Sequence, residues 1–177
     1  MTRKPALILA VSLLVALYPA AARATLDTFG VITGPSATLA GAVSGRALDT
    51  NLGLGWSTDF IFDALTGFDL NADLAYRAAS RAVQAQGSLD FVLRWLLRAG
   101  VSAAADLIAD RHGGRGFYLG PNFAVSLPLR EFIGDIGFHA EYFIVPFYRY
   151  YFPLQGNDIS GWHVFGVRLE FAPFITG

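Results

Sequence analysis

Nine charged side chains lie within apolar stretches of this chain, and those in the same stretch are an even number of residues apart. What chemistry they can do depends on whether they come into contact in the folded protein. They are Asp59, Asp69, Asp73, Asp90, Arg94, Arg98, Glu141, Arg168 and Glu170. Side chains two positions apart lie on the same face of a β-strand, so strands would gather these acids and arginines on one surface. A charged group buried away from water is costly unless it is paired, so buried carboxylates and guanidinium groups are expected to form ion pairs. The pattern therefore predicts an ion-pair network, with Arg94, Arg98 and Arg168 as the expected partners of the acids.

The three histidines are the other candidates for chemistry. His112 lies in the glycine-rich segment Arg111 to Gly116, His139 precedes Glu141 by two residues, and His163 lies near the end of an expected strand. Their spacing matches no known pattern of metal ligands, and the chain has no cysteine for thiol catalysis or metal binding. The glycine-rich segment resembles an anion-binding loop, but no helix is expected after it. We therefore expect structural histidines and no catalytic, cofactor-binding or metal-binding residue.

Alternating polarity predicts the strands that position these residues. From Asn51 to Asp63, apolar side chains such as Leu52, Leu54 and Trp56 alternate with glycine, serine and aspartate. This period of two is typical of a strand with one apolar and one polar face. The same alternation predicts about eight strands, at residues 36–44, 51–63, 68–77, 88–98, 101–110, 117–127, 137–149 and 165–171.

The expected connections alternate in length. Longer polar segments at residues 45–50, 78–87, 111–116 and 151–161 would lie at one end of the strands. Shorter turns near Leu65, Gly100 and residues 131–135 would lie at the other end. The region Ala72 to Leu97 also permits helices, because Asp73, Arg77 and Arg81 are four residues apart. The alternation in the flanking segments favours strands there.

The N-terminus reads as a secretory signal. Arg3 and Lys4 precede the apolar run Ala6 to Leu17, and Ala22 to Ala24 matches an A-x-A cleavage site. We expect residues 1–24 to be removed and residues 25–177 to form one domain; an uncleaved anchor helix is the alternative. Three of the 13 basic residues fall within the signal, so 10 remain against 14 acidic residues. This acidic balance argues against nucleic acid as a partner.

Strands of about ten residues with one apolar face have the length that a tilted membrane strand needs. In lipid every backbone polar group must be paired, so the sheet has to close on itself. The apolar face would then meet lipid and the polar face would fill the lumen. Aromatic residues fall near the expected strand ends, as in interfacial girdles. We therefore predict an all-β, closed, antiparallel, up-and-down transmembrane β-barrel of about eight strands.

The whole of the expected mature chain resembles the small bacterial outer-membrane β-barrels, the class of the OmpA membrane domain, OmpX and OmpW. The resemblance is strongest in the last strand, Phe165 to Phe171, where Gly166, Leu169 and Phe171 fit the terminal strand that the outer-membrane assembly machinery binds. The tail Ala172 to Gly177 departs from it, because such proteins normally stop at the aromatic residue. The resemblance implies the outer membrane of a Gram-negative bacterium, contacts with its lipid and assembly machinery, and an unknown extracellular loop partner.

These observations favour a structural or surface-interaction protein, porin-like in architecture, whose polar lumen is filled by side chains. The charged network would specify the fold; a gate that opens a small channel by exchanging ion pairs is the sharper alternative. Two other functions stay open. A soluble periplasmic barrel could bind a lipid or another apolar ligand, with its apolar faces turned inward. An outer-membrane lipid-modifying enzyme would need a serine and a histidine with a supporting acid on the lipid-facing side.

Overall fold

The computed structural model describes residues 30–44, 47–62, 66–93, 96–108, 116–129, 141–155 and 161–176. The predicted signal, residues 1–24, lies outside this range. No helix in the described part of the chain is long and apolar enough to cross a membrane.

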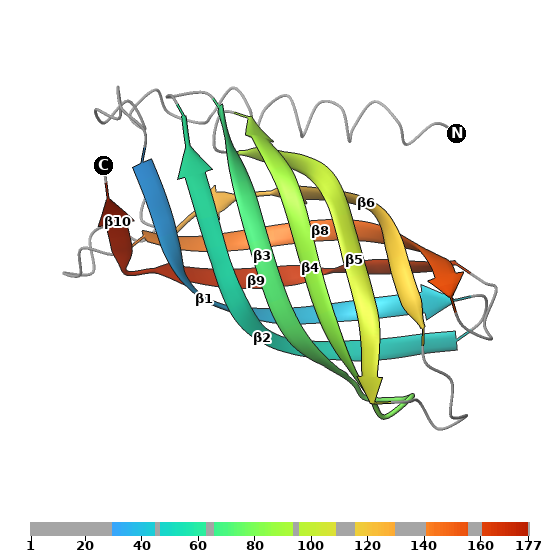
Figure 1. Cartoon of the computed structure of the whole chain (residues 1–177). Coiled ribbons are helices and arrows are strands. Elements are labelled where there is room, and N and C mark those ends of the chain that lie inside the picture. Colours follow the sequence, from blue (N-terminus) through green and yellow to red (C-terminus); the bar gives the residue numbers. More distant parts are fainter. Residues whose placement is uncertain are drawn as a thin grey trace, which may run out of the picture.

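Eight long strands form a closed barrel (Figure 1). They are β1 (Gly30–Ser44), β2 (Ala47–Ile61), β3 (Thr66–Arg77), β4 (Ala82–Leu93), β5 (Leu97–Ile108), β6 (Phe117–Val125), β8 (Glu141–Gln155) and β9 (Trp162–Ala172). Two short pieces, β7 (Leu127–Pro128) and β10 (Phe174–Thr176), continue β6 and β9 and pair with β8 and β1. Each long strand pairs antiparallel with its neighbours in the chain, and β1 pairs with both β2 and β9. The predicted all-β, up-and-down closed barrel is confirmed.

The register fixes the tilt of the strands. One path follows directly paired residues around the barrel from β1 back to β1. It passes through Ile32, Asp59, Asp69, Asp90, Gly100, Asn122, Arg149, Val164 and Ala42. The path returns to β1 ten residues beyond its start, from Ile32 to Ala42. For eight strands at ordinary spacings, this stagger corresponds to a tilt of about 40° and a radius of roughly 8 Å. Side chains can fill an interior of that width.

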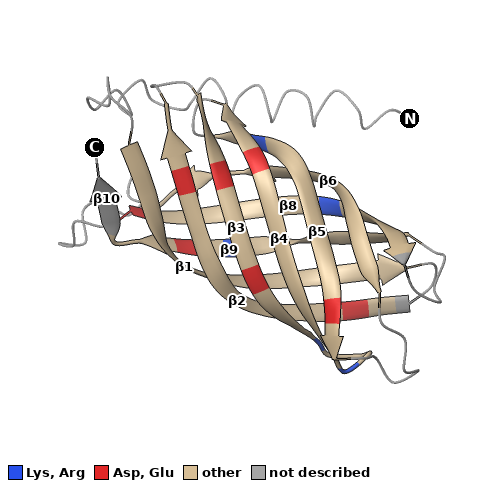
Figure 2. Cartoon of the chain, in the orientation of Figure 1, with Lys and Arg blue, Asp and Glu red and all other residues tan. Residues whose placement is uncertain are grey.

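Side chains alternate strictly between lumen and outer surface on most strands. In β3, Asp69, Asn71 and Asp73 are buried inside the barrel, whereas Leu70 and Leu74 are half exposed on the outside. Figure 2 shows that acids and arginines lie within the strands and not only at their ends. The predicted assignment of the polar face to the lumen and the apolar face to the outside is confirmed for these strands.

Several predicted boundaries are wrong. In the described part of the region Ala72 to Leu97, residues 72–77, 82–93 and 97 lie in strands, and the predicted connection at residues 78–87 shrinks to the turn 78–81. The turn expected at Gly100 is absent, because Gly100 lies within β5 opposite Asp90 and the chain reverses between Leu93 and Leu97. In β4 the inward residues before Asp90 are Ala82, Gln84, Gln86 and Ser88, and most of their outward neighbours are small, so the contrast between faces was too weak to predict the part of the strand before residue 88.

The predicted contrast between long and short connections is also wrong. We call the end of the barrel where β1 begins the proximal end, and the end where β1 stops the distal end. The two residues between β1 and β2 make the shortest connection, at the distal end. Twelve residues separate β7 from β8 at the proximal end, where short turns were expected. Loop length therefore gives no orientation for this chain.

The barrel closes along β1 and β9, where the predicted end of the last strand needs correction. β9 runs to Ala172, and after Pro173 the tail pairs again with β1, placing Phe174 opposite Thr33. Gly34 lies inside this seam, and any Cβ there would collide with the carbonyl oxygen of Phe171. The tail is thus part of the closing seam, and the absence of a side chain at Gly34 lets the two strands approach.

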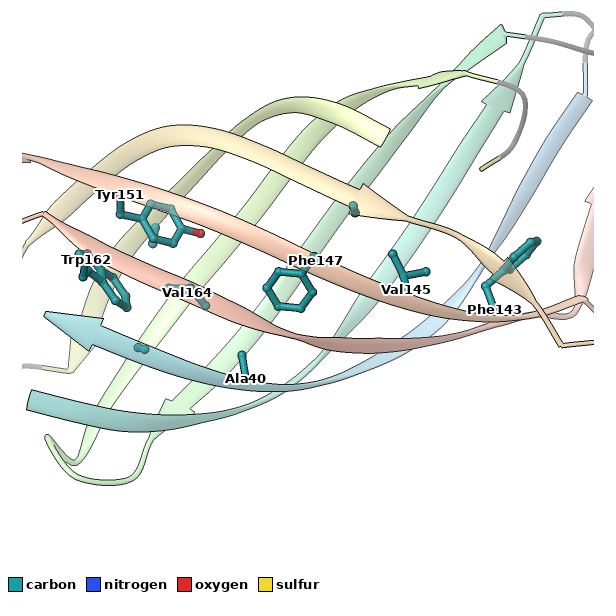
Figure 3. Packing of buried hydrophobic residues seen from close by; sticks show 10 residues of the cluster. Ala40, Phe143, Val145, Phe147, Tyr151, Trp162 and Val164 are labelled. Atoms are coloured by element: carbon teal, nitrogen blue, oxygen red, sulfur yellow. The ribbon is translucent and has the colours of Figure 1, made fainter. Parts of the chain in front are cut away.

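β8 and β9 carry an apolar strip on the lumen side that the alternation of polarity does not predict. Phe143, Val145, Phe147 and Tyr151 all face inward from β8, and they pack with Trp162 and Val164 of β9 (Figure 3). Small residues on other strands, including Ala40 of β1 and Ala104 of β5, belong to the same packed cluster. Because the outward face of β8 is also apolar, its sequence shows little alternation. The lumen is therefore filled by charged residues on one side and by aromatic and aliphatic residues on the other.

Candidate functional site: the charged lumen

Arg98 is the centre of the charged network near the proximal end. It is the second residue of β5, and its guanidinium reaches three carboxylates on three other strands. Nη1 lies 2.7 Å from Asp69 Oδ2, while Nη2 lies 3.0 Å from Glu170 Oε2 and 3.4 Å from Asp59 Oδ2. Nε donates to the hydroxyl of Ser126. One buried arginine therefore ties β2, β3 and β9 to β5 across the lumen.

Arg168 of β9 makes the second bridge. Its Nε lies 2.6 Å from Glu170 Oε1 and its Nη2 lies 2.9 Å from Asp69 Oδ2. The hydroxyl of Ser57 donates to Asp69 at 2.9 Å and makes a second contact with Glu170 at 3.2 Å. The five charged residues of the lumen cluster, Asp59, Asp69, Arg98, Arg168 and Glu170, are each at most 5% exposed. Their charges are largely balanced by one another, as low dielectric surroundings require.

The other predicted members lie elsewhere. Asp73 and Asp90 are buried in the lumen but accept hydrogen bonds from neutral groups, Ser36 at 3.3 Å and Asn122 at 2.6 Å. Glu141 is half buried at the start of β8, and the expected bridge from Glu141 through Arg168 to Glu170 is replaced by one from Asp69 to Glu170. Arg94 lies outside the described residues.

The residues expected to form the assembly strand sit on β9. Leu169 and Phe171 point outward and are 52% and 36% exposed. Gly166 lies between Ala40 of β1 and Phe147 of β8, and a Cβ there would collide with the backbone of β1. Their arrangement is that of an ordinary barrel strand with an apolar outer face.

Arg149 is a buried lumen arginine that the sequence analysis left out of the network. Its Nε donates to Asn122 Oδ1 at 3.1 Å and its Nη1 to Gln86 Oε1 at 3.4 Å. The guanidinium also lies 4.6 Å from the ring centroid of Phe147. Its position on the polar parity of β8 was visible in the sequence. The contact with Gln86 was not, because Gln86 lies on β4, 63 residues away in the chain, whereas Asn122 lies on the adjacent strand β6, directly opposite Arg149.

A second set of interacting side chains lies at the distal end of the barrel. Asp49 of β2 accepts hydrogen bonds from the backbone nitrogens of Ala79 at 2.7 Å and Ser80 at 3.2 Å, and it pairs with Arg77 Nε at 3.2 Å. The guanidinium of Arg77 lies 4.5 Å from the ring centroid of Trp162. Asp49 therefore fixes the turn between β3 and β4, and Arg77 links that turn to β9. The predicted connection at residues 45–50 is therefore wrong for Asp49, which lies in β2.

Of the three histidines, the structure describes His163 alone. His163 points outward from β9, and its Nδ1 lies 2.8 Å from the hydroxyl of Tyr148, with the ring of Tyr150 at 4.7 Å between centroids. His112 and His139 lie outside the described residues. Within the ranges that the structure describes, no group of three or more histidine, cysteine or acidic side chains could hold a metal ion. The residues that meet are thus suited to pairing charges across the barrel.

No family model matches the chain, and comparisons with curated proteins and with solved structures give no match either.

Proposed function

We propose that this chain is an integral outer-membrane β-barrel protein with a structural or surface-interaction role and no enzymatic activity. The observation that carries the proposal is the polarity of the barrel wall. Its inward face holds paired charges, whereas its outward face is apolar on every long strand. This order is the reverse of the one a barrel in water needs, and it matches a wall that is surrounded by lipid.

The extent of the apolar outer face supports lipid contact. Leu54 is 73% exposed, Leu48 66% and Leu39 58%, and each of the eight long strands carries at least one exposed large apolar side chain. Scattered exposed apolar residues are normal in soluble proteins, but contiguous apolar surfaces beyond a few hundred Å² mark contact with a membrane or a partner. A surface that surrounds the barrel suits a membrane, which also contacts it from all sides.

Aromatic clusters near both ends of the outer face are typical of interfacial girdles. At the proximal end Phe68 packs edge-on against Phe62 and Phe91, with ring centroids 5.6 and 5.7 Å apart. Towards the distal end the ring centroid of Tyr150 lies 4.6 Å from that of Phe152 and 4.7 Å from that of His163. In the distal cluster, the hydroxyl of Tyr150 gives its ring a polar tip, which suits the boundary between hydrocarbon and water.

The polar residues of the lumen argue for an interior filled by side chains and against an apolar binding cavity. A soluble barrel that binds an apolar ligand needs apolar inward faces, yet the inward faces of β3 and β4 carry Asp69, Asn71, Asp73, Gln84 and Asp90. The lumen cluster joins four strands through two arginines. We therefore assign the network to holding the fold and not to binding or gating.

Membrane fractionation tests the proposal. The full chain, expressed in a Gram-negative host, should remain with the outer membrane after an alkaline carbonate wash. Its unheated form should migrate faster on a gel than its boiled form, because a closed barrel resists detergent unfolding at room temperature. Recovery in the soluble periplasmic fraction without detergent would refute the proposal.

A further inference from the structure

The outer face of β1, β2 and β3 carries an apolar hollow of about 760 Å³. Five of its twelve lining residues are leucines: Leu39, Leu52, Leu54, Leu74 and Leu169. The small side chain of Ala37 lies among them, and the inward-facing residues Thr38, Gly53 and Ala75 also line the hollow. Inward-facing residues can line an outward hollow only through their backbone, so its floor lies at the backbone of the strands.

One end of the hollow lies at the distal rim of the barrel. Tyr76 and Val83 line it there, and these two residues are directly paired between β3 and β4. Tyr76 is the next-to-last residue of β3, and Val83 is the second residue of β4. The hollow thus runs from the middle of the wall to the level where β3 turns into β4.

A positively charged side chain, that of Arg81, lies in the turn at this rim. Arg81 ends the turn between β3 and β4, two residues before Val83, and its side chain is exposed. Its backbone has a φ of 55°, and the turn that holds it is fixed by the hydrogen bonds from Ala79 and Ser80 to Asp49. Arg81 does not line the hollow, but it lies two residues from Val83, which does. An apolar hollow with an exposed cation close to one end is complementary to an acidic amphiphile.

We propose that this hollow binds one acyl chain of an anionic phospholipid, whose phosphate is held by Arg81. The leucine wall would cover the chain, and Tyr76 would lie at the boundary between chain and head group, where such rings are favoured. A basic residue at the membrane surface attracts anionic lipid with about the energy of a five-fold change in affinity. The inference rests on the proposed membrane location and adds a lipid preference to it.

The test compares lipids that remain bound when the barrel leaves the membrane. The full chain is inserted into mixed vesicles of phosphatidylcholine and phosphatidylglycerol, extracted in mild detergent and weighed by native mass spectrometry. We expect one retained phosphatidylglycerol per barrel in preference to phosphatidylcholine. Arg81→Gln should lower that retention about five-fold, because only the charge contact is lost. Ala37→Leu should also lower it, because the larger side chain would occupy part of the hollow beside Leu39 and Leu54.

Two matched variants control for general effects. Arg115→Gln removes the same charge from the connection between β5 and β6, and Ala103→Leu enlarges an outward residue on β5, which does not line the hollow. Neither should change retention. Equal retention of the two lipids by the unaltered chain, or equal losses in test and control variants, would overturn the inference. Failure to insert into vesicles at all would instead count against the proposed membrane location.

Discussion

Replacing Arg98 with methionine should lower the free energy of unfolding by about 3–5 kcal/mol, because it leaves Asp59, Asp69 and Glu170 as a buried group of acids with one arginine. Methionine preserves much of the side-chain length, so the loss of charge dominates over the loss of volume. The measurement is a denaturant titration of the barrel in detergent micelles, followed by the gel shift between folded and unfolded forms.

Charge balance gives this experiment its control. Asp69→Asn alone should also destabilise the barrel, since Asp69 contacts both Arg98 and Arg168. The double variant Arg98→Met with Asp69→Asn removes one charge of each sign, so it should lose less than the sum of the single losses. A cost below about 1 kcal/mol for Arg98→Met, or strictly additive losses, would show that the cluster is not a mutually dependent network.

Two outward leucines on β2 should respond differently to the same change. Leu54 is the central residue of β2 and Leu48 its second residue, and they are 73% and 66% exposed on the same face. An arginine at the middle of a membrane wall costs about 2–4 kcal/mol, whereas one near the interface costs about 0–1 kcal/mol. Leu54→Arg should therefore destabilise a bilayer-inserted barrel much more than Leu48→Arg.

The pair separates a membrane wall from a wall in water. Exposed surface substitutions in a soluble protein usually change stability by less than about 0.5 kcal/mol, whatever their position along a strand. The measurement is the free energy of folding into phospholipid vesicles, taken from reversible denaturant titrations of both variants. Equal and small effects at Leu54 and Leu48 would contradict a lipid-facing wall.

Alternation made the closed barrel predictable where the two faces differ strongly. Along β2 and β3, Leu54 and Leu70 contrast with Ser57 and Asp69, so both strands and their hairpin follow from period two. The rule became uninformative in β8, where Phe143 and Phe147 face inward and Tyr148 faces outward. When both faces are apolar, the period vanishes, and the inward strip emerges only from pairing with β6 and β9.

Partners within the lumen were predictable in type but less so in pairing. The parity of Arg98, Arg168, Asp69 and Glu170 placed them on one face, and the barrel brings these four together. Which acid meets which arginine depends on register across the lumen. Because the register shifts by ten residues around the barrel, each strand is displaced along the barrel axis relative to the strand before it. Residues that are not directly paired can therefore lie at the same height in the lumen. No local pattern encodes that stagger.

The most direct test of a barrel wall whose apolar outer face lies in lipid uses the absence of cysteine from the chain. Single substitutions Leu54→Cys, in the middle of the outer face, and Ala78→Cys, in the exposed turn after β3, are labelled with a water-soluble maleimide in intact membranes. A wall in lipid predicts that Ala78→Cys is labelled, and that Leu54→Cys is labelled only after the barrel is unfolded in hot detergent. Equal labelling of the two cysteines in the folded protein would contradict the account.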